Sequence, residues 1–274
     1  MKFDKLALAC GVLLLAVASG GCNRLKARDQ LNKGVAAFRN AQFQAAIMHF
    51  KESVRLDSSL LNAKLYLATA YSQLYIPGGE SEENIKIARQ AIETYGDVLA
   101  LDPKNVTAIA STALIYYQMK NFDKAKEFQR QRLELEPNNP EPYYWIGVIN
   151  WAICYPRQAQ LRKNLKINVP KDISNPDTLP PLPEKARAEL AKDNGPLVDE
   201  GLKALQKAVE LKPNYSDAMV YLSLTYRQRA DLDPDSSTHE ADLQQANDWV
   251  QKALDIRKRG GENAAPATSA AGGS

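Results

Sequence analysis

Apolar residues recur along the chain at the i, i+3, i+4, i+7 spacing of amphipathic helices. The helical segments themselves repeat, with a period of about 34 residues. The clearest copy runs over residues 106–139, where two helical segments flank Asn121-Phe122-Asp123. A period of roughly 20–50 residues is typical of stacked supersecondary units. The pattern therefore predicts a series of stacked helix pairs and not a single closed core.

Short stops divide the rest of the chain into further repeats. Proline cannot continue a helix, so each stop is expected to end a second helix and to begin the next repeat. The stops are Leu56-Asp57-Ser58, Leu101-Asp102-Pro103, Leu135-Glu136-Pro137 and Leu211-Lys212-Pro213, with Ile256-Arg257-Lys258 in the last repeat. They define five repeats, at residues 27–60, 61–105, 106–139, 140–215 and 216–258.

Small residues stand where the paired helices must approach closely, and large apolar residues stand at the packing positions. The small ones are Gly34, Ala46, Ala68, Ala91, Ala113, Ala125, Gly147, Gly201, Ser223 and Ala246. The large ones are Phe50, Tyr71, Tyr95, Tyr116, Tyr226 and Val250. This arrangement resembles the tetratricopeptide repeat family, although the family's leading Trp is absent from all five repeats. The resemblance implies an all-α, right-handed helix-turn-helix solenoid of about five helix pairs over residues 27–258.

Three repeats are longer than the family unit. The extra residues lie at Tyr75–Glu83, at Leu232–His239 and, most extensively, at Tyr155–Pro196. The longest insertion holds seven prolines, a helical pattern over 184–194 and a segment, 157–166, that is compatible with a continuation of the preceding helix. We expect a protruding hairpin capped by a Pro-rich loop. It serves either as a binding element or as a spacer.

The N-terminus follows a different pattern. Two lysines precede an apolar run over 6–17, and small residues lead to Cys22, which together give the three parts of a secretory signal over 1–21. A Cys after two small residues resembles the processing box of bacterial lipoproteins. That resemblance implies a lipid on Cys22, a short tether over 22–26 and a periplasm-facing place at a bacterial membrane. Asn23 favours the outer membrane. A plain secreted protein and an uncleaved anchor are the alternatives.

Net charge and composition disfavour nucleic-acid binding and indicate the nature of the C-terminal residues and of Cys154. The formal net charge is only +3, so no field attracting nucleic acid is expected. Residues 259–274 are rich in small residues and are expected to be disordered. Cys154 lies on an apolar helix and is interpreted as a buried structural thiol.

Few residues offer chemistry. His49 and His239 have no metal-ligand or catalytic partners at suitable spacing, and Ser237 to Glu240 around His239 fits a helix capping box. A weak calcium candidate consists of alternating acidic residues, but Ser236 stands where a calcium loop needs Gly. Its members are Asp231, Asp233, Asp235 and Asp242. We therefore expect a non-catalytic protein without cofactor or small-molecule substrate.

In the resembled family, the first helix of each pair lines a concave groove. Transfer by repeat phase places there Phe38, Arg39, Thr69, Gln73, Tyr117, Gln118, Tyr144, Trp151, Arg227 and Gln228. Tyr117, Tyr144 and Trp151 have an alternative role as core residues. The cationic clamp of chaperone-tail-binding members is absent, because its places hold residues such as Leu31, Thr69 and Leu114.

The expected partner is a protein or peptide, as an amphipathic helix or an extended segment. The implied role is a membrane-anchored scaffold in envelope, outer-membrane or pilus and secretion assembly. The rivals are a secreted adaptor, an envelope enzyme built on repeats and a structural spacer.

Overall fold

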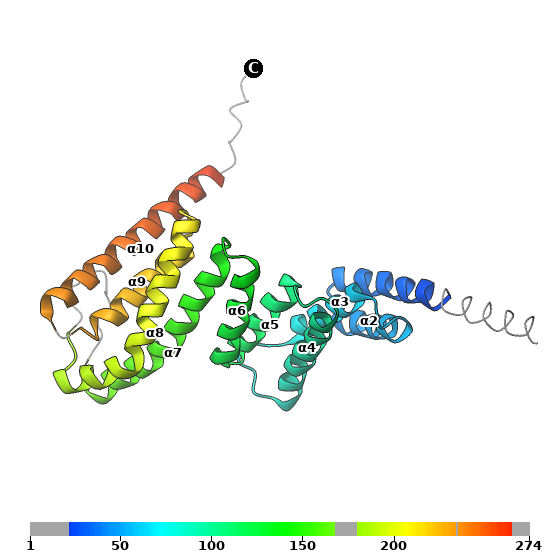
Figure 1. Ribbon diagram of the computed structural model, residues 1–274, viewed down its shortest axis with the longest axis horizontal. Coiled ribbons are helices and arrows are strands. Elements are labelled where there is room, and N and C mark those ends of the chain that lie inside the picture. Colours follow the sequence, from blue (N-terminus) through cyan, green and yellow to red (C-terminus); the bar gives the residue numbers. More distant parts are fainter. Residues whose placement is uncertain (1–21, 168–179, 234, 265–274) are drawn as a thin grey trace, which may run out of the picture. The chain divides into compact units, whose positions relative to one another are not determined.

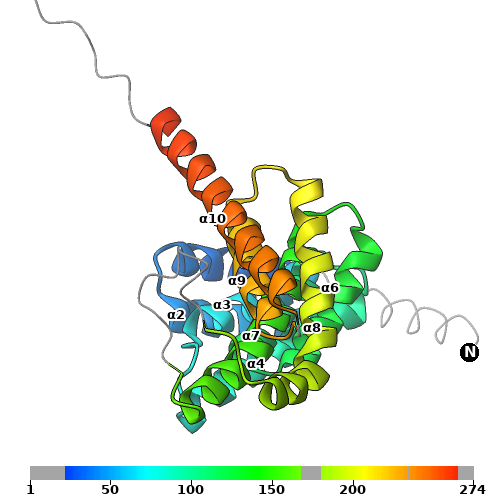
Figure 2. The same ribbon diagram turned by 90° about the vertical axis from the view of Figure 1, so that its left-hand side faces the viewer.

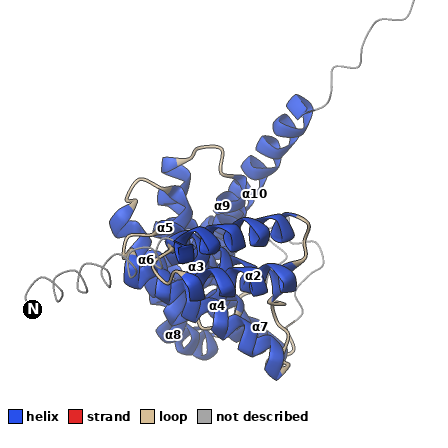
Figure 3. Ribbon diagram, turned by 90° about the vertical axis from the view of Figure 1, so that its right-hand side faces the viewer, coloured by secondary structure: helices blue, strands red, loops and turns tan. Residues whose placement is uncertain are grey.

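The computed structural model describes residues 22–167, 180–233 and 235–264, and these residues form helices and turns without any strand (Figure 3). The segment 1–21, the residues 168–179 and the end of the chain from 265 lie outside the described residues. A helix over residues 22–39 comes first. It is followed by α2 (Phe43–Leu56), α3 (Leu61–Leu74), α4 (Glu82–Leu101), α5 (Val106–Gln118), α6 (Phe122–Leu135), α7 (Pro140–Asn164), α8 (Glu184–Leu211), α9 (Ser216–Ala230) and α10 (Ser236–Ala264).

These helices match the five expected pairs one for one, and the all-α repeat fold predicted from the sequence is confirmed. The first four stops lie between a second helix and the next first helix, as at Asp102 to Asn105, where Asn105 caps α5 through its side chain. The fifth, Ile256-Arg257-Lys258, lies within α10 and does not end it. The chain divides into two compact bodies, the N-terminal body ending at Gln131 and the C-terminal body beginning at Arg132. Each body has its own apolar core.

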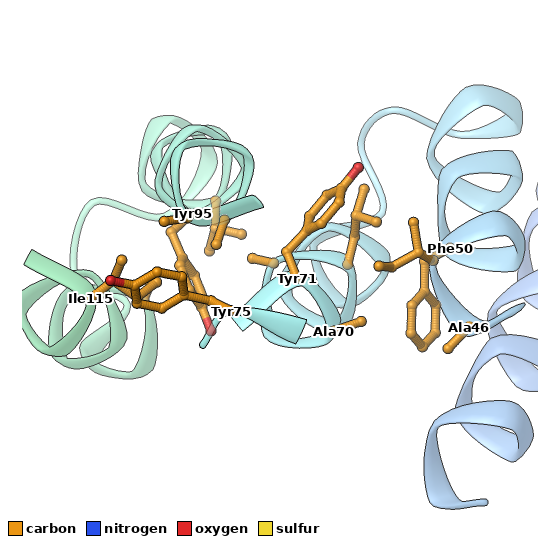
Figure 4. Close-up of a cluster of buried hydrophobic side chains, with 14 of the residues drawn as sticks. Ala46, Phe50, Ala70, Tyr71, Tyr75, Tyr95 and Ile115 are labelled. Carbon is orange, nitrogen blue, oxygen red and sulfur yellow. The ribbon is translucent and has the colours of Figure 1, made fainter. Parts of the chain in front are cut away.

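The core of the N-terminal body is built from large aromatic residues set against alanines (Figure 4). Phe50 and Tyr95 are almost completely buried, and Ala46 and Ala91 have no exposed surface. A Cβ atom at Gly34 would overlap the Phe50 ring, so glycine is required for this close approach. The small and large positions read from the sequence therefore serve as predicted.

The C-terminal body contains α7 to α10, which Figures 1 and 2 show as neighbouring helices. Leu205 and Leu222 are fully buried at its centre. Gly147 on α7 faces Leu205 on α8, where a Cβ atom would overlap the leucine side chain. The closest contact between these two helices therefore depends on the small residue expected there.

The long insertion of the fourth repeat lengthens two helices. α7 continues through Pro156 to Asn164, and α8 begins at Glu184 and continues through Pro196. The two helices are joined near both prolines, because the Asn194 side chain donates to the carbonyl of Cys154 over 3.3 Å. Cys154 itself is fully buried, as predicted. The capping Pro-rich loop falls mostly on residues 168–179, outside the described residues.

Three boundaries differ from the sequence prediction. Residues 22–26 are helical, so they do not form an extended tether. α10 extends to Ala264, past the predicted end of the last repeat at residue 258, so residues 259–264 are helical and not part of the expected disordered tail. Glycine disfavours a helix by only about 1 kcal/mol relative to alanine. α10 begins at Ser236, and Asp235 accepts the backbone N–H of Ser237, so the predicted capping box over 237–240 is wrong.

No helix among the described residues combines the length and apolar character needed to cross a bilayer.

Candidate functional site

The candidate groove residues of the N-terminal body lie on first helices of their pairs, at different depths. Arg39 and Gln73 are exposed, whereas Phe38 is half-buried, with its ring centroid 5.4 Å from that of Phe43. Thr69 donates its hydroxyl to the carbonyl of Leu65 over 2.8 Å, which is a bond within its own helix. These residues leave polar and aromatic atoms at the surface, and their role in a groove stays a prediction.

Tyr117 and Gln118 lie at the end of α5 and are half-buried. The Tyr117 ring is tilted against Phe122, with 5.9 Å between centroids, and burial raises the pKa of its hydroxyl. Tyr117 therefore packs partly against the turn into α6. The core alternative thus describes part of the Tyr117 side chain, and its place in a groove stays a prediction.

The C-terminal body carries a run of touching aromatic rings, which we call the aromatic strip. It consists of Tyr144, Trp151 and Tyr155 on α7, of Tyr215 just before α9, and of Tyr221 on α9. Trp151 stacks on Tyr155 with 4.9 Å between centroids and meets Tyr221 edge-on at 5.5 Å. Tyr144 lies 5.1 Å from Tyr215 and 5.7 Å from Tyr221.

The rings of the strip are only partly covered. Tyr155 is 52% exposed, and Tyr144, Trp151 and Tyr221 are half-buried. Tyr215 is buried, and its hydroxyl donates to Glu141 over 3.3 Å. The strip thus has an anchored inner part and an outer part at the surface.

Sequence reasoning found Tyr144 and Trp151 but missed Tyr155 and Tyr221. The signal for Tyr155 was present, because it follows Trp151 by four residues and thus lies on the same helix face. Tyr155 begins the proline-rich insertion, where the repeat phase assigns no groove position. Tyr221 joins the strip only through the packing of α9 on α7, which no local pattern reveals.

Arg227 and Gln228 serve helix packing. The Arg227 guanidinium donates to the Asn247 side chain over 2.6 Å, and burial lowers its pKa. Gln228 is only 3% exposed, and its amide donates to the carbonyl of Trp151. Gln228 therefore holds α9 against α7 and is too deep to contact a partner, contrary to its predicted place in the groove.

A buried ion pair secures the insertion. Arg162 on α7 pairs with Asp231, which follows α9, and both side chains are at most 5% exposed. The Arg162 Nε donates to the Asp231 Oδ2 over 3.0 Å, and its Nη1 donates to the carbonyl of Pro180 over 3.0 Å. Gln158 donates to the same carboxylate. The extended end of α7 is thus fixed to the loop between α9 and α10.

The weak calcium candidate does not assemble. Asp231 is held by Arg162, Asp242 accepts from the Arg229 Nε over 2.7 Å, and Asp235 accepts from the Ser237 hydroxyl. Among the described residues no group of three or more His, Cys, Asp or Glu could hold a metal ion. The acidic residues therefore serve ion pairs and a helix start, as their separate partners show.

Asp233, the fourth member of the calcium candidate, and the two histidines contact other residues of the protein. The pKa of Asp233 is raised to about 6, mainly by burial and to a smaller extent by a hydrogen bond with Asp242. His239 lies with its Nδ1 2.7 Å from the carbonyl of Ala230, and the Nδ1 of His49 lies 2.8 Å from the Gln30 side chain. Both rings link neighbouring helix segments.

Comparison with known sequences agrees with this fold. A model described as tetratricopeptide repeat matches residues 110–139. Hsp70-Hsp90 organizing protein 3 of Arabidopsis thaliana is 27% identical over 115 residues, which are 42% of this chain and 19% of that protein. Interferon-induced protein with tetratricopeptide repeats 2 of Cricetulus griseus is 26% identical over 183 residues, 67% of this chain and 31% of that protein. The chain thus spans about a fifth to a third of the length of these curated relatives.

Solved structures with the same arrangement of helices include two of MamA. A crystal structure of MamA protein superposes with a TM-score of 0.56 at 14% identity, covering 89% of this chain and 98% of that one. A MamA structure from Desulfovibrio magneticus RS-1 gives a TM-score of 0.56 at 16% identity, covering 85% and 96%. At such identities the likeness concerns the fold alone.

Proposed function

Because the chain is a tetratricopeptide-repeat protein, we propose that it is a non-catalytic scaffold that holds a segment of another protein on the aromatic strip. Helix-pair repeats mostly bind other proteins, and the repeat relatives support the same general role here. The observation that carries the proposal is the strip itself, with its outer ring 52% exposed and its inner ring buried and hydrogen-bonded.

The chemistry of the strip favours an extended partner segment with apolar side chains. Aromatic residues supply large contact areas, lose little side-chain freedom and are frequent energetic anchors of interfaces. Trp151 and Tyr221 already meet edge-on, so their orientation is set before a partner arrives. A pre-formed surface avoids part of the ordering cost of binding.

The names of some relatives refer to Hsp70 and Hsp90. For this chain we propose a different partner, because the cationic clamp implied by the family for chaperone tails is missing. Its places hold Leu31, Thr69 and Leu114. The partner is instead proposed to belong to envelope, outer-membrane or pilus and secretion assembly.

The test is site-specific crosslinking from the strip. A photoreactive phenylalanine analogue at Tyr155 is expected to capture a protein in cells, and the captured segment is then made as a labelled peptide. Trp151→Ala is expected to weaken the binding of that peptide by roughly 30-fold, the size of an interface hot spot. Circular dichroism checks that helicity is unchanged.

A matched control is Leu254→Ala on α10, which removes another half-exposed apolar side chain of the same body outside the strip. Its affinity for the peptide should equal that of the unaltered chain. Equal weakening by Leu254→Ala and Trp151→Ala, or none by Trp151→Ala, would show that the strip is not the binding surface.

We further propose that a lipid on Cys22 holds the protein at a membrane, facing the bacterial periplasm. Cys22 is exposed at one end of the helix over residues 22–39, and Leu25 beside it is 72% exposed. At about 1.5 Å per helical residue, Arg24, Lys26 and Arg28 would all lie near the headgroups. Each basic residue near an anionic surface contributes roughly 1 kcal/mol of attraction.

A further inference from the structure

The insertion of the second repeat forms a loop, residues 75–81, between α3 and α4. Asn84 on the first turn of α4 fixes it by three hydrogen bonds of 2.8 Å: it accepts the N–H of Ile76 and donates to the carbonyls of Ile76 and Gly79. The Asn84 side chain is only 6% exposed. The loop backbone is therefore tied to the first turn of α4 at Ile76 and Gly79.

The loop presents an apolar side chain to the surface. Ile76 is 67% exposed although both of its backbone polar groups are bonded to Asn84. A single exposed apolar residue is normal on a protein surface. Here, however, the backbone of Ile76 is hydrogen-bonded to Asn84. Less conformational entropy is lost on binding when the contact residue is already ordered.

A cavity of about 390 Å³ lies beside this loop. Its apolar lining is Tyr75, Ile85 and Met119, and the remaining lining residues are Gly78, Gly79, Glu80, Arg89, Gln118 and Lys120. The volume falls within the range of roughly 300–1,000 Å³ typical of small binding sites. Four of the nine lining residues belong to the insertion, so a repeat of ordinary length would lack this cavity.

The charged residues of the cavity are unbalanced. Arg89 and Lys120 contribute two positive charges, and Glu80 contributes one negative charge. Neither Arg89 nor Lys120 forms an ion pair with another described residue. The cavity therefore combines an apolar lining with two cations that are not paired with a carboxylate of the described residues.

We propose that this cavity and Ile76 form a second docking site, in the N-terminal body, for an acidic segment of a partner protein. The segment would place an apolar side chain against Tyr75, Ile85 and Met119 and would pair a neighbouring carboxylate with Arg89 or Lys120. Charge-assisted hydrogen bonds from Arg and Lys to a carboxylate are stronger than neutral ones and give the site its preference. This site does not depend on the aromatic strip.

The probe is the peptide acetyl-Asp-Leu-Glu-amide, titrated into the full chain with NMR detection of the methyl groups of Ile76, Ile85 and Met119. We expect saturable shifts of these three methyl groups. The uncharged peptide acetyl-Asn-Leu-Gln-amide should bind roughly tenfold more weakly, because it offers no carboxylate. The double variant Arg89→Gln and Lys120→Gln should erase that difference.

Lys86→Gln is the matched control, because it removes an exposed cation of α4 outside the cavity and should leave both affinities unchanged. Ile76→Ser should weaken both peptides without loss of helicity. Equal binding of the two peptides, or an unaltered preference in the double variant, would overturn the proposal. Trp151→Ala should not affect this titration, so failure of the aromatic strip and failure of this site can be told apart.

Discussion

At the scale of single residues, substitutions at two glycines distinguish the effect of packing on stability from that of helix propensity. Gly34→Val should destabilise the N-terminal body, because the added atoms collide with the fully buried Phe50. Overpacking of this kind costs about 1–3 kcal/mol. Urea unfolding followed by circular dichroism measures the change.

Gly96→Ala on α4 is the corresponding control, since a Cβ atom there meets nothing within 4 Å. It should stabilise the helix by roughly 0.5–1 kcal/mol, because alanine has the better helix propensity. If Gly34→Val proved as harmless as Gly96→Ala, the close approach of the first helix and α2 would be disproved.

Asp233 gives stability a pH dependence. Its pKa of about 6 lies above the ordinary value of 3.8, so the folded state binds more protons than the unfolded state between these values. Its contribution to stability is therefore lost as the pH rises through this range. Asp233→Asn should be more stable than the unaltered chain at pH 7.5, by on the order of 1 kcal/mol after solvent screening, and nearly equal at pH 4.

Urea unfolding at the two pH values tests this, with Asp199→Asn, an exposed aspartate on α8, as the reference. A stability gain for Asp233→Asn that is the same at pH 4 and at pH 7.5 would exclude titration of Asp233 as its cause.

Residue types with a local rule were predictable from the sequence. Gly34 and Gly147 were found because a helix-pair repeat needs a small residue at one phase, and the structure sets both against large apolar side chains. Gln228 occupies a groove phase, yet its amide turns into the contact with α7. The position within the repeat predicts which helix face a residue lies on. Whether a residue at the edge of that face is buried depends on the neighbouring helix, which here is α7.

At the scale of elements, the fourth repeat shows how an insertion is stabilised. Arg162→Met would leave the Asp231 carboxylate buried without its main partner. Removal of one member of a buried ion pair costs about 3–5 kcal/mol. We therefore expect a marked fall of the midpoint of chemical unfolding of the C-terminal body.

The double variant Arg162→Met and Asp231→Leu should recover much of that loss, because no charge then remains buried. Arg55→Gln is the surface control: its partner Glu52 is also solvent-exposed, so the midpoint should hardly move. A double variant less stable than Arg162→Met would show that the pair itself carries the stability.

The elements could be predicted where turn residues punctuate the helical pattern, as at Pro103 and Pro137. At Pro156 the helix continues, as the pattern over 157–166 allowed, and the Arg157 guanidinium contacts Asn194 on α8 over 3.3 Å. The sequence pattern over 184–194 did not indicate that α8 continues through Pro196. The Arg162 to Asp231 pair spans 69 residues, so no sequence window could have joined them.

At the scale of the whole molecule, the proposed anchor makes one residue decisive. Cys22→Ser should release the protein from isolated membranes into the soluble fraction, because no other lipid attachment is proposed. Cys154→Ser is the control: that thiol is fully buried, so membrane association should persist. Sedimentation of membranes followed by immunodetection measures both, and retention of Cys22→Ser would exclude the lipid anchor.

The three tryptophans of the chain are distributed unevenly. Trp145, Trp151 and Trp249 all belong to the C-terminal body, and the N-terminal body has none. Intrinsic emission excited at the red edge of the protein absorption band therefore reports on one body without any label, whereas the far-ultraviolet dichroism of the helices reports on both. Because Trp151 lies in the aromatic strip, the same emission should also change when a partner segment binds the strip.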